Sequence, residues 1–226
     1  MRRRLFLLVP MLALGAVLAT ARADDSPSAL ERDPKGWTDL LAKAGPGLNG
    51  WTRGPLPPDS PLKPESPWSL DQATGNLVCE GQGYHEWLRW DQELGDAVLH
   101  VEWRFTPVEG KTKGYNSGVF VRNSADAKVW HQAQTGGGTG GFLFGDTPVN
   151  GEIKRINLSK ELKDQRVKPA GDWNTYEITC QGKSISIWTN GALTCEWQGC
   201  EAPKGYVGLE AEGYRIEFRN VKVKPL

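Results

Sequence analysis

The sequence predicts an all-β fold, a jelly-roll sandwich of two antiparallel sheets with only short peripheral helices. From Trp68 onward, apolar and polar residues alternate in short runs, and Gly, Asn or Asp turns separate the runs about every eight to twelve residues, as in sandwiches and barrels. Helical periodicity is confined to residues 36–43 and 158–163. Residues 54–67 are rich in proline, which predicts a surface loop that no helix or central strand could accommodate.

Eight runs give the clearest strands. They are residues 76–80, 97–105, 117–122, 175–180, 184–189, 193–197, 206–211 and 216–223. Asn190-Gly191 lies between two of them, and this dipeptide is a strong signal for a two-residue hairpin.

The N-terminus predicts a secretory signal peptide over residues 1–23. Three arginines precede a nearly unbroken apolar run from Leu5 to Ala19, and Ala21-Arg22-Ala23 is a small-x-small cleavage site. Both the general export route and a twin-arginine route fit this segment. We therefore expect an exported protein, periplasmic or extracellular, with no membrane span once the signal is removed. A flexible segment at 24–33 and one domain at 34–226 complete the expected organisation.

Charge and cysteine usage restrict the partners. The chain has 27 basic and 27 acidic residues, and removal of residues 1–23 takes away four arginines and no acid, which leaves 23 against 27. A mildly acidic protein without a basic stripe is a poor partner for nucleic acid. Four cysteines allow three full disulfide pairings in an oxidising compartment, and small buried thiols are the alternative.

Alternation also predicts one polar sheet face. In the run 97–105, Leu99, Val101 and Trp103 point to one side, and the polar residues between them point to the other. If the strands are neighbours, the polar face gathers His100, Glu102, Arg104, Asn116, Arg122, Gln132, Gln134, Glu210 and Glu212. Such a face is either plain solvated surface or a binding site. Amides and arginines, together with ten tryptophans in the chain, favour a sugar site.

Several catalytic motifs are not supported. The run Gly136 to Gly141 lacks the Gly-Lys-Ser/Thr ending of a phosphate-binding loop, and no Gly-x-Ser-x-Gly elbow exists. The Glu-x-Asp-x-x-Glu triplet of sandwich glucanases is also missing. His131 is predicted to lie beside the polar face, as a base, a sugar contact or an ordinary histidine.

A series of short motifs resembles a known family. They are Gly36-Trp37-Thr38-Asp39-Leu40, Leu48-Asn49-Gly50-Trp51, Glu102-Trp103-Arg104, Asn116 to Arg122, Gly171-Asp172-Trp173-Asn174, Asn190-Gly191 and Glu217 to Leu226. In this order they resemble the 3-keto-disaccharide hydrolases, also described as 3-keto-glucoside 1,2-lyases and 3-keto-2-hydroxyglucal hydratases. The resemblance spans roughly residues 34–226. It implies a concanavalin A-like sandwich, in agreement with the pattern of alternation.

The resemblance also implies a chemistry. A ketone at C3 of a glucoside acidifies the hydrogen at C2, a base removes that proton, and the C1 aglycone leaves; addition of water completes a net hydrolysis. An oxidised 3-keto-glycoside or another saccharide is the expected partner. No cofactor is firmly predicted, and a divalent metal ion is one way to stabilise the enolate, with ligands left unknown.

Two departures from the family pattern concern the site. Where the family commonly has Tyr-Glu-x-Gln, this chain reads His131-Gln132-Ala133-Gln134, and Leu-Gln-x-His-Gly is here Leu209-Glu210-Ala211-Glu212-Gly213. Catalysis is predicted for Glu212 or Glu210, with His131 as the alternative base. Substrate binding is predicted for Glu102, Arg104, Asn116, Arg122, Gln132 and Gln134. A non-catalytic carbohydrate-binding module on the same sandwich, or a structural surface protein, is the alternative to an enzyme.

Overall fold

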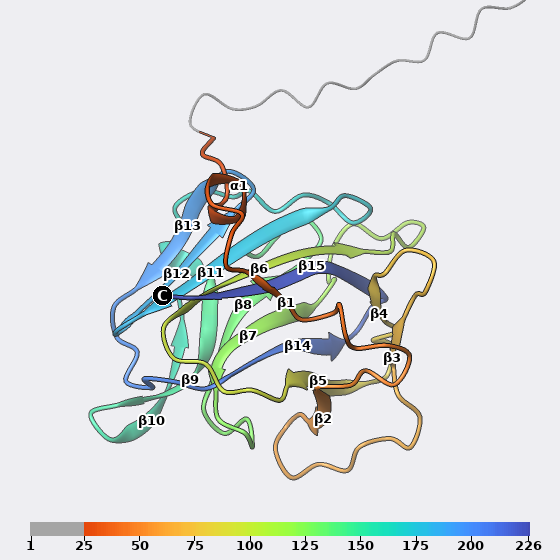
Figure 1. Cartoon of the computed structure of the whole chain (residues 1–226), viewed down its shortest axis with the longest axis horizontal. Helices are drawn as coiled ribbons and strands as arrows, with labels where there is room; N and C mark the ends of the chain where they lie inside the picture. The colour runs from red at the N-terminus through yellow and green to blue at the C-terminus, as the bar shows by residue number, and fades with distance from the viewer. Residues whose placement is uncertain (1–24) are drawn as a thin grey trace, which may run out of the picture.

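The computed structural model describes residues 25–226 and shows two packed antiparallel sheets, as the sequence predicts (Figure 1). The predicted signal peptide, residues 1–23, lies outside the described residues. The 8-stranded sheet has the order β13-β12-β11-β6-β15-β4-β3, with β1 paired to β15, and the 7-stranded sheet has the order β10-β9-β8-β7-β14-β5-β2. In Figure 1, β6 and β15 lie above β14 and β5.

The 8-stranded sheet is formed by β1 (Thr38–Asp39), β3 (Trp68–Leu70), β4 (Leu77–Cys79), β6 (Ala97–Phe105), β11 (Asn174–Gln181), β12 (Ser184–Thr189), β13 (Ala192–Trp197) and β15 (Ile216–Pro225). The 7-stranded sheet is formed by β2 (Trp51–Pro55), β5 (His85–Trp90), β7 (Ser117–Asn123), β8 (Trp130–Thr135), β9 (Leu143–Val149), β10 (Glu152–Asn157) and β14 (Tyr206–Glu212). All eight predicted strands are present within two residues of their expected ends.

The core lies between the sheets, where the inward residues of both alternate with outward polar ones. Trp103 of β6 is fully buried and packs edge-on against Phe105 and Tyr176. Val119 of β7 and Leu209 of β14 close the core from the opposite sheet. The hairpin predicted at Asn190-Gly191 joins β12 to β13, with φ of 44° at Asn190 and 107° at Gly191. This two-residue turn is the kind that glycine and asparagine favour.

The helix predicted for residues 36–43 is wrong, and the helix predicted for residues 158–163 is too long. Within residues 36–43, Thr38–Asp39 pairs with β15 as a strand, and Asp39 then accepts hydrogen bonds from the backbone N–H groups of Leu41 and Ala42, which turns the chain. Leu40 and Leu41 are buried, so their helix-like spacing serves core packing instead. Residues 158–163 contain only one 3₁₀ turn, η1 (Ser159–Glu161).

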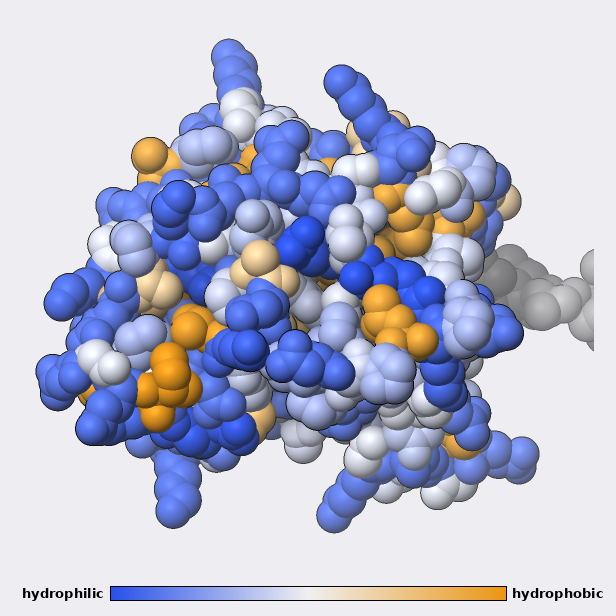
Figure 2. Space-filling model, turned by 90° about the horizontal axis from the view of Figure 1, so that it is seen from below, coloured by the Kyte–Doolittle hydropathy of each residue, from blue (hydrophilic) through white to orange (hydrophobic). Residues whose placement is uncertain are grey.

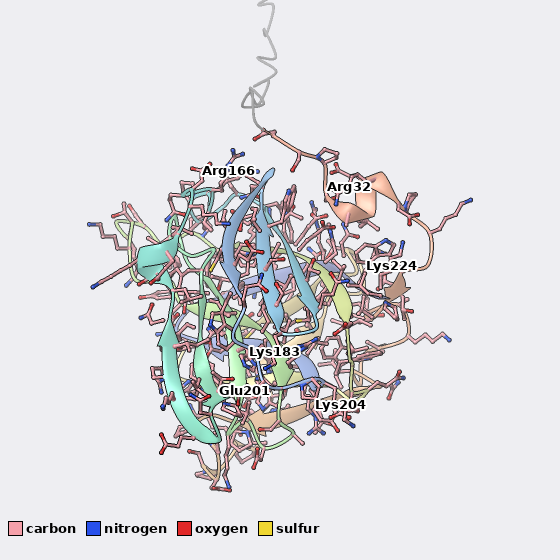
Figure 3. The ribbon with its side chains drawn as sticks, turned by 90° about the vertical axis from the view of Figure 1, so that its left-hand side faces the viewer. Arg32, Arg166, Lys183, Glu201, Lys204 and Lys224 are labelled. Atoms are coloured by element: carbon pink, nitrogen blue, oxygen red, sulfur yellow. The ribbon has the colours of Figure 1, made fainter. Side chains whose placement is uncertain are left out.

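The segment predicted to be flexible has a defined conformation from Asp25 onward. Residues Ala29–Arg32 form the short helix α1, which Ser28 and Glu31 cap reciprocally. The carboxylate of Glu177 on β11 accepts the N–H of Leu30 at 3.0 Å and that of Ala29. Figure 3 shows Arg32 and Arg166 at this end of the molecule, where Arg166 binds Asp25. These contacts attach the segment to the 8-stranded sheet.

The cysteines are buried thiols and not disulfides. Cys79, Cys180, Cys195 and Cys200 are all unpaired in the structure. Burial raises the pKa of Cys79 and of Cys180 to about 12, so neither is a thiolate at neutral pH. None of the pairings that the sequence allows is present, and the alternative of small buried thiols is the one found.

Candidate active site

The predicted polar face is divided between the two sheets. Glu102 and Arg104 lie on β6 in the 8-stranded sheet, whereas β7, β8 and β14 belong to the 7-stranded sheet. Glu102 accepts hydrogen bonds from Arg219 at 2.7 Å and Asn220 at 2.5 Å, and Arg104 pairs with Glu217 at 3.0 Å. The prediction that these two residues share a face with the others is wrong, because alternation gives the face of a strand but not the sheet to which it belongs.

Arg122 leaves the predicted face because its backbone interrupts the alternation. Its φ is 51°, and the pairing of β7 with β14 shifts register beside it. The guanidinium is buried and donates to the carbonyls of Gly182 at 2.6 Å and Ala202 at 3.0 Å and to Asp96 at 2.6 Å. Arg122 therefore holds loops together at the end of β7 and does not line the site.

His131 points into the sandwich and not toward the polar face. It lies between Trp130 and Gln132 on β8, so its side chain faces inward, and it is fully buried. Its Nε2 lies 2.8 Å from the hydroxyl of Thr147. Burial lowers the pKa of His131 to about 4, so the imidazole is neutral. The expectation that it lies beside the polar face is wrong.

The other five predicted residues come together. Asn116, Gln132, Gln134, Glu210 and Glu212 line one pocket of about 390 Å³ on the outer face of the 7-stranded sheet. From the side of β2, β5 and β14 the surface is mainly hydrophilic, with small separate hydrophobic patches (Figure 2). Pockets of this size accommodate small ligands.

Amide side chains fix the two carboxylates of the pocket. Gln132 Nε2 donates to one oxygen of Glu210 at 2.7 Å, and Asn116 Nδ2 donates to one oxygen of Glu212 at 2.5 Å. Gln134 Nε2 in turn donates to Asn116 Oδ1 at 2.6 Å, which sets the orientation of that amide. Burial raises the pKa of Glu210, and the charge of Glu212 adds to the shift. Glu210 thus holds a proton more readily than an ordinary glutamate does.

His85 is a site residue that the sequence interpretation missed. It lies directly opposite Glu212 in the pairing of β5 with β14, and its Nε2 is 3.7 Å from Glu210 Oε1. The nearby carboxylate of Glu210 raises the pKa of His85 above 6.5, and the charge of Glu212 acts in the same direction. Alternation along β5 would have placed His85 outward, but nothing in the sequence identifies β14 as the neighbour of β5.

The same three side chains fit a divalent cation. Ligand atoms of His85, Glu210 and Glu212 all lie within 4.8 Å of one another. One oxygen of each carboxylate is held by an amide, which orients the carboxylates as outer-sphere hydrogen bonds do around metal ligands. Imidazole and carboxylates together suit several divalent transition metals.

The opposite end of the pocket is apolar, and the sequence interpretation did not single it out. Leu56 and Pro57 follow β2, and Trp130 and Phe144 face them from β8 and β9. Asp146 and Arg155 form an ion pair at its edge.

The jelly-roll sandwich with its carboxylate- and amide-lined pocket falls in a carbohydrate-active class of domains, because a family of that class matches most of the chain. The chain belongs to the 3-keto-alpha-glucoside-1,2-lyase-like domain family, whose sequence profile matches residues 36–224. The search of curated proteins found no match. Within residues 25–226, no helix is long and apolar enough to cross a membrane.

Solved structures show the same fold at low sequence identity. A Parabacteroides distasonis protein, provisionally described as a glycosyl hydrolase, has a TM-score of 0.59 at 16% identity and covers 89% of this chain and 99% of its own. The carbohydrate-binding module CBM66 of Bacillus subtilis has a TM-score of 0.56 at 14% identity, covering 77% and 95%. A Bacillus licheniformis β-glucanase has a TM-score of 0.50 at 15% identity, covering 84% and 97%.

Proposed function

We propose that the domain hydrolyses 3-keto-glucosides by elimination of the C1 aglycone followed by addition of water. The observation that supports this most is the cluster of two carboxylates and one imidazole within 4.8 Å at the polar end of the pocket. Proton abstraction beside a ketone needs a base, a proton donor for the leaving group and a positive charge near the enolate. The cluster supplies one candidate for each.

Glu212 is assigned as the base and Glu210 as the acid. Glu212 is less buried than Glu210, whose raised pKa favours the protonated form. In the first step Glu212 takes the proton from C2, and the electron pair of the C2–H bond forms the enolate of the C3 ketone. The ketone then re-forms as the C1–O bond breaks, C1 and C2 become doubly bonded, and the departing oxygen takes the proton of Glu210. Water adds to C1 and a proton returns to C2.

His85 supplies positive charge next to the enolate. Its raised pKa favours the imidazolium, and the pocket's other cationic side chain, Arg155, is already paired with Asp146 among the described residues. If His85, Glu210 and Glu212 instead held a divalent cation, the cation would supply Lewis acidity at the same place and the two carboxylates would be ligands in place of acid and base. Asn116 and Gln134 keep Glu212 in position in either case.

The assay is release of the aglycone from a chromogenic 3-keto-glucoside, with the unoxidised glucoside beside it and with or without added divalent metal. We expect release from the keto sugar alone. Glu212→Gln should lower kcat about 100- to 10,000-fold, because a positioned base contributes about that much. Glu196→Gln is the matched control, since Glu196 is exposed on β13 in the other sheet. Full activity in Glu212→Gln would contradict the assignment.

No release from either sugar, combined with saturable binding of a glycan, would instead assign the protein to the carbohydrate-binding modules.

We also propose that residues 1–23 are a signal peptide that directs the domain to the periplasm or the extracellular space. Removal of the signal peptide is checked by the N-terminal sequence of the mature protein, for which Asp24 is the expected first residue. Retention of Met1 on exported protein would contradict this.

A further inference from the structure

The apolar end of the pocket is built around a fixed row of aromatic rings. Trp130 and Phe144 are half-buried, with ring centroids 5.1 Å apart at an angle of 77°. Phe120 lies 6.1 Å from Trp130 and 5.7 Å from Trp87, again edge-on. Trp87 and Phe120 are fully buried, and through the contact of Phe120 with Trp130 they support the half-buried pair. Edge-to-face contacts of this kind keep aromatic side chains in place before any ligand arrives.

Glycines on the two neighbouring strands leave the space that the indole ring of Trp87 occupies. A Cβ at Gly54 would lie 2.2 Å from Trp87 Nε1, and a Cβ at Gly208 would lie 2.5 Å from Trp87 Cε3. The indole of Trp87 therefore lies across two strands that carry no side chain at these positions. Leu56 packs on this cluster from the Pro-rich loop and, together with Pro57, forms the wall of the pocket opposite Trp130.

The polar groups at this end bind one another. Asp146 accepts hydrogen bonds from Arg155 Nη2 at 2.7 Å and from Trp130 Nε1 at 3.1 Å, and it also accepts one from Arg155 Nε. Arg155 in turn lies 5.0 Å over the ring of Phe144. A second sugar placed here would have to compete for Asp146 and Arg155, because both groups already have hydrogen-bond partners, and that competition costs free energy. An aromatic ring would bury apolar area against Phe144 and Trp130 instead.

The polar and apolar ends are adjacent across the sheet. Gln132, which holds Glu210, is the direct pairing partner of Phe144. Glu210 and Phe144 are separated by β7 and β8, so three strand spacings of about 4.8 Å divide their backbones. This distance leaves room for one sugar ring over the carboxylates and one further ring beside Phe144.

We propose that Leu56, Pro57, Trp130 and Phe144 form the aglycone subsite and that it takes an aromatic aglycone in preference to a second sugar. This rests on the proposed function for the identity of the sugar at the other end. The natural substrates would then be oxidised aryl glucosides.

The test compares three 3-keto-glucosides, with a methyl, an aryl and a glucosyl aglycone, in the wild type and in Phe144→Ala. Each substrate is compared with itself across the two proteins, so the intrinsic reactivity of the leaving group cancels. We expect the ratio of kcat/KM for the aryl substrate to that for the methyl substrate to fall about 5- to 10-fold in Phe144→Ala, from the size of aromatic contacts. Phe144→Leu, which keeps the site apolar and is less disruptive to the fold, should lower it less. Ile153→Ala on exposed β10 is the control.

Binding of unoxidised aryl and methyl glucosides, measured by calorimetry, separates the two proposals. If no 3-keto-glucoside is turned over but the aryl glucoside binds, and binds more weakly to Phe144→Ala, the aromatic subsite is supported and the elimination chemistry fails. If elimination proceeds but Phe144→Ala lowers all three substrates equally, or lowers the glucosyl substrate most, the aromatic preference is overturned.

Discussion

Gly118 determines how the buried carboxylate of the site is held. A Cβ at this position would lie 1.9 Å from Gln132 Nε2, so only glycine lets the side chain of Gln132 cross β7 and reach Glu210 on β14. The sequence departs from the family pattern at both ends of this hydrogen bond, with glutamine where glutamate is common and glutamate where glutamine is common. Relative to the pattern that the resemblance implies, the carboxylate and the amide are exchanged across this one hydrogen bond.

Reversal of this exchange is a test at the level of single residues. Gln132→Glu alone places two carboxyl groups about a hydrogen bond apart, which raises the pKa of one and should lower activity. Glu210→Gln alone removes the acid. The double variant restores one carboxyl and one amide, and we expect its kcat/KM to exceed that of Glu210→Gln at least about tenfold. The measurement is a double-mutant cycle with thermal melts of all four proteins. A double variant no better than Glu210→Gln would show that the position of the carboxylate is fixed.

The pH dependence of activity distinguishes imidazolium from metal chemistry at His85. The pKa of His85 is raised above 6.5, so the charged form is present below that pKa and is lost as pH rises through it. If the imidazolium stabilises the enolate, kcat falls on the alkaline side, and His85→Gln loses this limb of the profile. If His85 binds a metal, it must be neutral, and activity rises over the same range. The profile is recorded with and without a chelator.

At the scale of strands, the alternation of apolar and polar residues predicted the bounds and inner face of each strand well, but it did not predict which strands are neighbours in a sheet. The strict alternation in Ala97–Phe105 gives its bounds and its inner face because burial on one side selects apolar residues. The partner of each strand depends on contacts distant in sequence, which explains why Glu102 was grouped with residues of the other sheet. Five of the nine proposed site residues did come together, four of them on β8 and β14 and one, Asn116, directly before β7. The apolar wall formed by Leu56 and Pro57 was missed because a run of prolines predicts a loop but does not predict which part of the surface the loop covers.

The end of β7 illustrates how one residue acts through its element. Arg122→Lys should lower the free energy of unfolding by about 3 kcal/mol, because the single nitrogen of lysine cannot occupy both the position of Nη1, which donates to Gly182 and Ala202, and that of Nη2, which donates to Asp96. We expect kcat/KM to remain within about twofold at temperatures where the variant is folded, since the side chain lies outside the pocket. Urea unfolding and the elimination assay check this, with Arg104→Lys as an outer-face control. A selective loss of kcat without loss of stability would mean that Arg122 does take part in catalysis.

On the scale of the whole molecule, the two outer faces of the sandwich have different roles. The outer face of the 7-stranded sheet carries the pocket, and the N-terminal segment covers part of the other. There His100 Nδ1 lies 2.9 Å from Glu177, and its Nε2 lies 3.9 Å from Glu102. Glu177 also receives the first N–H groups of α1. Polar alternation looks the same in both sheets, so only the tertiary structure shows which face is covered.

This covered cluster should make stability depend on pH. Burial opposes the charged forms, but the carboxylates of Glu102 and Glu177 still raise the pKa of His100 above 6.5. The nearby imidazole of His100 and hydrogen bonds from Asn220 and Arg219 lower the pKa of Glu102 from 4.5 to about 2. The His100 contribution is complete below pH 6.5 and is lost as pH rises through its folded-state pKa. The Glu102 contribution is complete above pH 4.5 and is lost as pH falls toward 2.

The two contributions overlap between about pH 4.5 and 6.5, where the urea midpoint of the wild type should most exceed that of His100→Gln. Above this window the difference should shrink, because His100 loses its charge and pairs less strongly with the carboxylates. Below it the difference should shrink as Glu102 takes up a proton. Midpoints measured from pH 3 to 9 check this, and a difference that stays constant with pH would mean that His100 acts by packing against Trp37 alone. Because the cluster lies on the sheet opposite the pocket, the elimination activity of His100→Gln should follow only the folded fraction.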